Sequence, residues 1–177
     1  MHTLKMGVCR VTIASAILEL LDRGHFTAYG NQRRLRLHCA FKALTDWCAT
    51  TRTYSGVDTF TPGRLGLGDV WPEAGYKAQN CRILVKWLAH EASTVADADA
   101  NNDTRCLALH LSALDNMFNI METCNSRHFP DSELHDFVHA SGMACATTYF
   151  LLYSVVRHCE VMDWVCVSCS SGLHVTL

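Results

Sequence analysis

The sequence has little charge, and the charge that it has is nearly balanced. Charged residues make up 18% of the chain, hydrophobic residues make up 49%, and the formal net charge is −2. A disordered chain would carry less hydrophobic surface, so this composition predicts a globular protein. A domain that binds nucleic acid on its own is usually clearly basic, and the balance argues against that class. The length of 177 residues suffices for one domain with a sizeable core.

Several catalytic and targeting signals are also missing. Gly66-Leu67-Gly68 has no third glycine at the required spacing, no Gly-Lys-Ser/Thr and no strand before it, which argues against a phosphate-binding loop. Residue order reveals no Ser-His-Asp elbow and no paired carboxylates. We predict no cofactor. The N-terminus lacks a charged leader followed by an apolar segment and a cleavage site, so we expect an intracellular protein, cytoplasmic or nuclear.

Cysteine, in contrast, is abundant. The ten cysteines fall mostly on apolar helical faces, a pattern that favours buried reduced thiols over a disulfide framework. Cys166 and Cys169 have the spacing of half a zinc site or of a redox pair. A second pair of ligands is missing nearby, and a thioredoxin-like motif would open a helix after a strand, so we interpret this pair as structural.

Hydrophobic periodicity predicts an all-α fold, a single irregular bundle of about five helices over residues 1–160. Glycine and proline concentrate at 50–75, which predicts an irregular connector with a short turn of helix after Thr61-Pro62. The tail at 161–177 has no helical period, and we expect it to be poorly ordered. The first predicted helix covers about residues 3–22, with Gly24 as its C-terminal cap, and the second starts near Asn31, its N-cap. The other three cover about residues 74–93, 104–125 and 129–160.

The fifth predicted helix, 129–160, is the longest and the most apolar. No formally charged residue lies between His139 and Arg157, so we expect this helix at the centre of the bundle or in contact with lipid. The stretch 140–156 is slightly short for a bilayer and contains hydroxyl groups, which favours burial in protein and no membrane contact, with a small membrane-anchored protein as the alternative. Its apolar stripe is formed by Leu134, Phe137, Val138, Ser141, Cys145, Thr148, Leu152, Val155 and Cys159.

His135 and His139 form the sharpest local pattern. Two histidines at i and i+4 share a helix face and can chelate one zinc ion. A zinc protease places a glutamate after the first histidine to deprotonate the metal-bound water, whereas this chain has the shorter Asp136. No third ligand follows at an interpretable spacing. A zinc-dependent hydrolase that uses these two histidines is therefore an alternative function. The other interpretation is that the two histidines simply lie near the exposed start of a helix and bind no metal.

A second cluster is basic and lies at the start of the second predicted helix. Arg33, Arg34 and Arg36 could contact the phosphates of a nucleic acid, although a solvated helix face is the interpretation that we favour. On the third predicted helix, Arg82 is expected to point away from the buried face. The scattered acids are interpreted as caps or surface groups; they are Asp46, Asp58, Asp69, Glu73, Asp115 and Glu122.

Two segments resemble a known family. Met1-His2-Thr3-Leu4-Lys5-Met6-Gly7 resembles the Met-His-x-Leu-x-Leu-Gly signature of CACTA-type DNA transposases and related transposon-derived proteins. The segment KAQNCRILVKWLA at 77–89 resembles the helix that opens their α-helical region. In that family an aspartate two residues before the signature binds a catalytic metal, and this sequence begins at the methionine. The resemblance therefore implies a helical region without catalytic carboxylates, and no residue is carried over as catalytic.

These observations together predict a non-catalytic helical fragment of a transposase-like protein. We expect it to act as a packing or interaction module. The partner implied is a protein, either the nuclease core or a second copy of the chain. Contact with nucleic acid is expected only within an intact parent protein.

Overall fold

The computed structural model describes residues 8–66, 72–98, 101–123 and 131–158. This part of the chain forms one 3-10 helix and five α-helices and contains no β-strand. The predicted all-α fold is therefore confirmed. The helices are α1 (Cys9–Asp22), α2 (Arg33–Thr51), η2 (Gly63–Leu65), α3 (Ala78–Ala98), α4 (Asn102–Thr123) and α5 (Asp131–His158).

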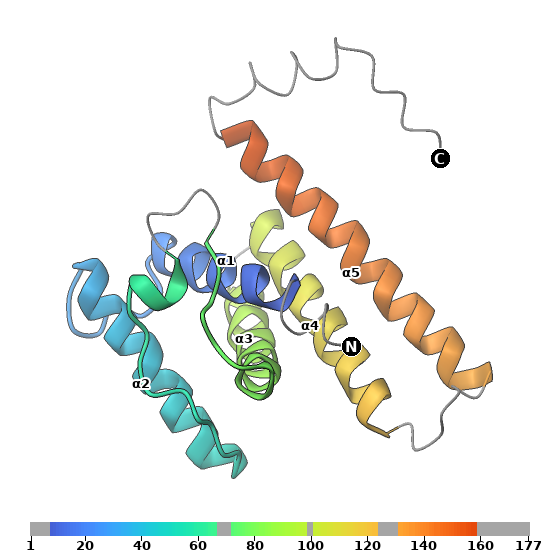
Figure 1. Ribbon diagram of the computed structural model, residues 1–177. Coiled ribbons are helices and arrows are strands. Elements are labelled where there is room, and N and C mark those ends of the chain that lie inside the picture. Colours follow the sequence, from blue (N-terminus) through green and yellow to red (C-terminus); the bar gives the residue numbers. More distant parts are fainter. Residues whose placement is uncertain (1–7, 67–71, 99–100, 124–130, 159–177) are drawn as a thin grey trace.

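The helix α3 is the centre of the bundle. It packs against α1 on one side and α4 on another, while α2 packs on α1 and α5 packs mainly on α4. In Figure 1, α2 and α5 therefore form opposite edges of the molecule. Trp87, Leu84 and Leu88 of α3 are fully buried and supply the largest apolar area at this centre. The order of the layers is thus α2, α1, α3, α4 and α5.

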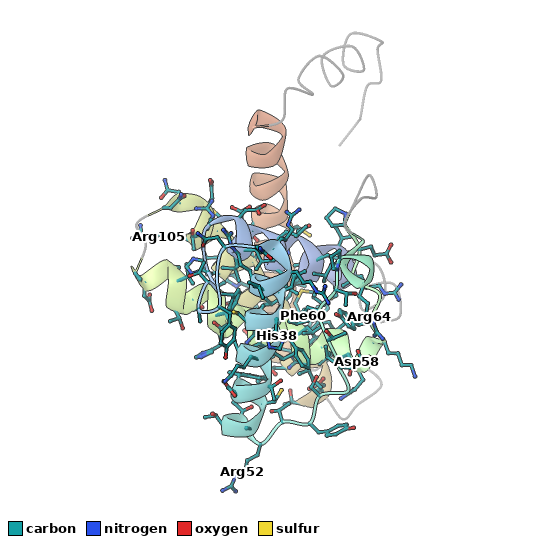
Figure 2. All side chains as sticks on the ribbon, turned by 90° about the vertical axis from the view of Figure 1, so that its left-hand side faces the viewer. His38, Arg52, Asp58, Phe60, Arg64 and Arg105 are labelled. Carbon is teal, nitrogen blue, oxygen red and sulfur yellow. The ribbon has the colours of Figure 1, made fainter. Side chains whose placement is uncertain are left out.

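The connector between α2 and α3 has no regular structure apart from η2, yet it contributes to the core. Phe60 is buried and stacks on Trp87 with 5.8 Å between the ring centroids, and Tyr76 meets Phe60 edge-on. Asp58 and Arg64 lie close together on the outer side of the connector (Figure 2), with 2.9 Å between the paired atoms. The predicted turn of helix after Thr61-Pro62 is confirmed by η2.

The helix ends follow local chemistry. Gly24 has φ +85°, its N–H donates to the carbonyl of Leu21 at 3.0 Å, and the N–H of His25 donates to Leu20 at 2.9 Å. This is the glycine cap predicted for the first helix. The predicted N-cap of the second helix is wrong by one residue, because α2 begins at Arg33 after Gln32, and no side chain caps it.

The central position predicted for the fifth helix is wrong for the part of α5 whose side chains are described, residues 134–147. Leu134 is 45% exposed and Val138 is 58% exposed, whereas Ala140, Ala144 and Thr147 are buried against the rest of the protein. Ala140 and Ala144 leave room for α5 to lie close to α4, and the partly buried Phe137 packs against the core from the same face. The end of α5 extends beyond the other helices (Figures 1 and 2).

In the described part of the chain, none of the helices combines the length and the hydropathy needed to cross a bilayer.

Candidate interaction surface

The helix α5 carries two neighbouring seams of apolar or small residues. The inner seam, which packs against the bundle, consists of Phe137, Ala140, Ala144 and Thr147. The outer seam consists of Leu134, Val138, Ser141 and Cys145. Leu134 lies three residues before Phe137, and each of the other three directly follows a member of the inner seam. One residue corresponds to about 100° around a helix, so the two seams face in different directions.

The outer seam is open in this structure. Leu134, Val138 and Cys145 are exposed, and Ser141 is half-buried. Met143, also exposed, lies elsewhere on the same helix. Scattered apolar residues are normal on a protein surface, but a seam with regular four- and three-residue steps is a helix-pairing pattern. The outer seam is therefore the candidate functional site of the described chain.

A buried histidine fixes the position of α5 on the bundle. The Nδ1–H of His110, on α4, lies 3.1 Å from the carbonyl oxygen of Ala144 and 3.2 Å from Oγ1 of Thr147. On the other side of the ring, Nε2 is 3.3 Å from Oγ1 of Thr12, on α1. Because a carbonyl can only accept, the ring proton is on Nδ1, and the hydroxyl of Thr12 donates to Nε2. One neutral imidazole thus joins α1, α4 and α5.

Burial lowers the pKa of His110, because the charged imidazolium would lose its hydration there. The hydrogen bond to the carbonyl of Ala144 acts in the opposite direction and is the smaller effect. The hydroxyls of Thr12 and Thr147 and the carbonyl of Ala144 face the ring from α1 and α5, and these three groups do not titrate. His110 is therefore a neutral structural group at pH 7.

A second polar cluster, formed around the buried Arg82, joins α3 to α4. The side chain of Arg82 is only 8% exposed, so the prediction that it points away from the buried face is wrong. Its Nε donates to Glu122 at 3.1 Å, its Nη1 donates to Asp115, and its Nη2 donates to Asn119 at 2.6 Å. The guanidinium also lies 5.1 Å from the ring centre of Phe118. Each of its three nitrogen atoms donates a hydrogen bond, two of them to carboxylates, which makes burial of the charge tolerable.

The interpretation of Asp115 and Glu122 as surface groups is correct for the exposed Glu122 but does not anticipate that both pair with Arg82. A signal was present in the spacing, since Asp115, Asn119 and Glu122 recur at four and three residues and so form one polar stripe on α4. Such a stripe next to the apolar stripe of the same helix indicates a buried cationic partner. Residue order alone does not identify Arg82 as that partner.

An open groove lies beside this cluster, between α2, α3 and α4, with a volume of about 610 Å³. Lys86 and His90 of α3 offer donors, Asp115 and Asn119 of α4 offer acceptors, and Trp47 of α2 also lines the groove. Asp115 and Asn119 are already bonded to Arg82. The remaining groups are mixed in kind, so the groove selects no class of ligand.

The structure places both predicted metal ligands on the exposed start of α5. Nδ1 of His135 lies 3.7 Å from a carboxylate oxygen of Asp136, and the side chains of both residues are well exposed. His139 is exposed as well. Within the described residues, no three His, Cys, Asp or Glu side chains come together in a way that could hold a metal ion. The zinc-dependent hydrolase stays a prediction with two candidate ligands.

The three arginines of the basic cluster have different surroundings. Nη1 of Arg36 donates to the carbonyl of Leu21 at 2.5 Å and so satisfies the end of α1. Arg33 lies 3.4 Å from a carboxylate oxygen of Asp22, and both side chains are more than half exposed. Arg34 is exposed. The cluster therefore ties α2 to the end of α1, and its contact with nucleic acid stays a prediction.

The cysteines in the described part of the chain form no disulfide there. Cys9, Cys39, Cys48 and Cys81 are buried, which confirms the predicted buried reduced thiols for these four. Burial raises the pKa of the Cys48 and Cys81 thiols, so both are protonated at pH 7. Cys145, on the outer seam, is exposed and accessible to reagents.

Several predictions fall on residues outside the described part of the chain. They concern the signature at 1–7 with His2, Asp69 as a cap or surface group, the Cys166–Cys169 pair, and the tail at 161–177. Comparison of the chain with models of protein families, with curated proteins and with solved structures finds no match. The resemblance to CACTA-type transposases therefore stays a prediction that depends on two short segments, of which 77–89 lies in and before α3.

Proposed function

We propose that this chain is a helical interaction module that binds another protein helix along the outer seam of α5. The single observation that supports it is the exposure of Leu134 and Val138 on a regular seam, while the neighbouring seam of the same helix is used for folding. A helix that served only to complete the bundle would need one apolar face. The second face is available for a partner.

The chemistry of the surface indicates the kind of partner. The outer seam offers two branched aliphatic side chains and two small ones, Ser141 and Cys145, which suits the close approach of a second α-helix with its own apolar seam. In a transposase-like parent, which is the setting that the sequence resemblance implies, this helix would contact the nuclease core or another protomer. The proposed role is non-catalytic.

Site-specific photo-crosslinking tests this proposal. Benzoylphenylalanine placed at position 138 of the full chain, in cells that express it, is expected to form an adduct with one defined protein. Leu109 on α4 is the matched control, because it is apolar and 51% exposed but lies off α5. An adduct at 138 and none at 109 supports the proposal. Equal labelling at both positions, or none at 138, overturns it.

A further inference from the structure

The outer seam has the length expected of a helix-pairing surface. In the sequence, the steps of four and three residues that place Leu134, Val138, Ser141 and Cys145 continue at Thr148, Leu152 and Val155. This is a period of 3.5 residues, the repeat of a left-handed coiled coil. The helix has 28 residues and is therefore about 42 Å long. A partner helix can follow it over several heptads.

The order of charges along α5 indicates which helix fits. In the sequence, its acidic residues stand near its beginning, at 131, 133 and 136, and its one Lys or Arg is Arg157 near its end. The residues at 140–156 carry no formal charge. In an antiparallel pair, the acidic start of each α5 lies beside the basic end of the other α5. In a parallel pair, like charges lie side by side.

We infer that the partner of the outer seam is a second copy of this chain, bound through an antiparallel pair of α5 helices. This inference depends on the proposed function and names its partner. A two-fold pair uses the same patch on both chains, which a single self-complementary seam satisfies. Cys145 lies close to the middle of Asp131–His158, so the two Cys145 side chains come near the two-fold axis.

Sedimentation equilibrium on the purified full chain tests the inference between micromolar and 0.1 millimolar concentration under reducing conditions. The wild-type chain is expected to dimerise. Val138→Asp introduces a charge into the seam and is expected to weaken dimerisation by at least about tenfold. Leu109→Asp, the matched control at a similarly exposed apolar residue, is expected to leave it unchanged. A wild-type chain that is monomeric throughout overturns the inference, as does an equal loss in both variants.

Crosslinking provides a second measurement that does not depend on a destabilising variant. A short bismaleimide is expected to join Cys145 of one chain to Cys145 of the other, and peptide mapping would identify the linked pair. Cys145→Ser should abolish this link while sedimentation still shows a dimer. Dimers that yield links between chains only at other cysteines would contradict the inferred geometry.

The experiments can overturn self-pairing without overturning the proposed interaction module. The adduct at position 138 contains a peptide of this same chain if the inference is correct. A peptide of a different protein, together with a monomeric purified chain, overturns self-pairing and leaves the interaction module standing. Absence of any adduct at 138 in a monomeric chain overturns both.

Discussion

Nδ1 of His110 on α4 and Oγ1 of Thr147 on α5 lie 3.2 Å apart in the interior of the protein. Thr147 in turn donates its hydroxyl proton to the carbonyl of Met143 at 2.7 Å, so its oxygen is free to accept from the ring. Ala140 and Ala144, two small residues on the described part of α5, are buried beside this pair. Small side chains bury little apolar area, so the hydrogen bonds to His110 add to the apolar contacts that hold α5 in place.

Acid should weaken the protein through His110. The pKa of this group in the folded chain is lowered from 6.5, so below about pH 6.5 the unfolded chain binds more protons than the folded one. The free energy of unfolding is therefore expected to fall as the pH drops below about 6.5, by up to about 1.4 kcal/mol per pH unit from this one group. Urea unfolding at pH 7.5 and pH 5.0 measures it.

Because the chain contains ten histidines, the contribution of His110 has to be measured as a difference between a variant and the wild type. In His110→Gln, the loss of stability between pH 7.5 and pH 5.0 should be smaller than in the wild type, whatever the absolute stability of the variant. His139, which is exposed, supplies the control His139→Gln, with an expected pH dependence equal to that of the wild type. Identical slopes for wild type and His110→Gln would show that His110 is not the buried neutral group described here.

Removing the hydroxyl of Thr147 should loosen α5 without changing its shape. Thr147→Val keeps the volume and deletes the acceptor for His110, and the expected loss is about 1 kcal/mol in the free energy of unfolding. Thr94→Val is the matched control, because Thr94 makes the same kind of bond to the carbonyl four residues earlier, at 3.0 Å, on an exposed face of α3. Its effect should stay within about 0.5 kcal/mol. Equal effects would mean that the contact with His110 contributes nothing.

Substitution of Arg82 should cost more than substitution of an exposed arginine. Arg82→Met keeps much of the packing but removes the hydrogen bonds to Asp115, Asn119 and Glu122. Because these acceptors are partly or well exposed, the expected cost is about 1–3 kcal/mol. Arg64→Met is the control, since the Arg64–Asp58 pair is exposed on the connector and should contribute at most about 1 kcal/mol. Urea unfolding measures both variants. A cost for Arg82→Met as small as that of the control would show that the cluster around Arg82 is not stabilising.

Local patterns in the sequence predict the elements of this fold well. The apolar stripes of α1, α3 and α4 and the glycine at Gly24 are short-range features, and short-range features determine where a helix forms and ends. The connector at 50–75 is equally visible from its glycine and proline residues. What these patterns leave open is which helix lies at the centre.

The position of α5 depends on which of its two seams is buried against the other helices. That choice is decided by contacts with other helices and not by the sequence of α5 alone. A helix with Leu134 and Val138 on one side and Ala140 and Ala144 on the next suggests that the bulkier side is buried. In the structure Ala140 and Ala144 face the bundle, where Nδ1 of His110 on α4 lies 3.1 Å from the carbonyl oxygen of Ala144. Arg82 was missed for the same reason, because its three partners are all on another helix.

Gly24 and Gly63 differ in backbone conformation but not in the room around them, so substituting each by alanine isolates the effect of backbone conformation on stability. A Cβ at Gly24 or at Gly63 would meet no atom within 4 Å, but only Gly24 has a positive φ, +85°. Gly24→Ala should therefore cost about 1 kcal/mol, because an L residue is strained in the left-handed region. Gly63→Ala should be neutral or stabilise the protein by up to about 1 kcal/mol, since alanine reduces the entropy of the unfolded chain. Thermal unfolding of both variants beside the wild type measures the pair. Equal shifts would show that the cap of α1 is not held in the conformation described here.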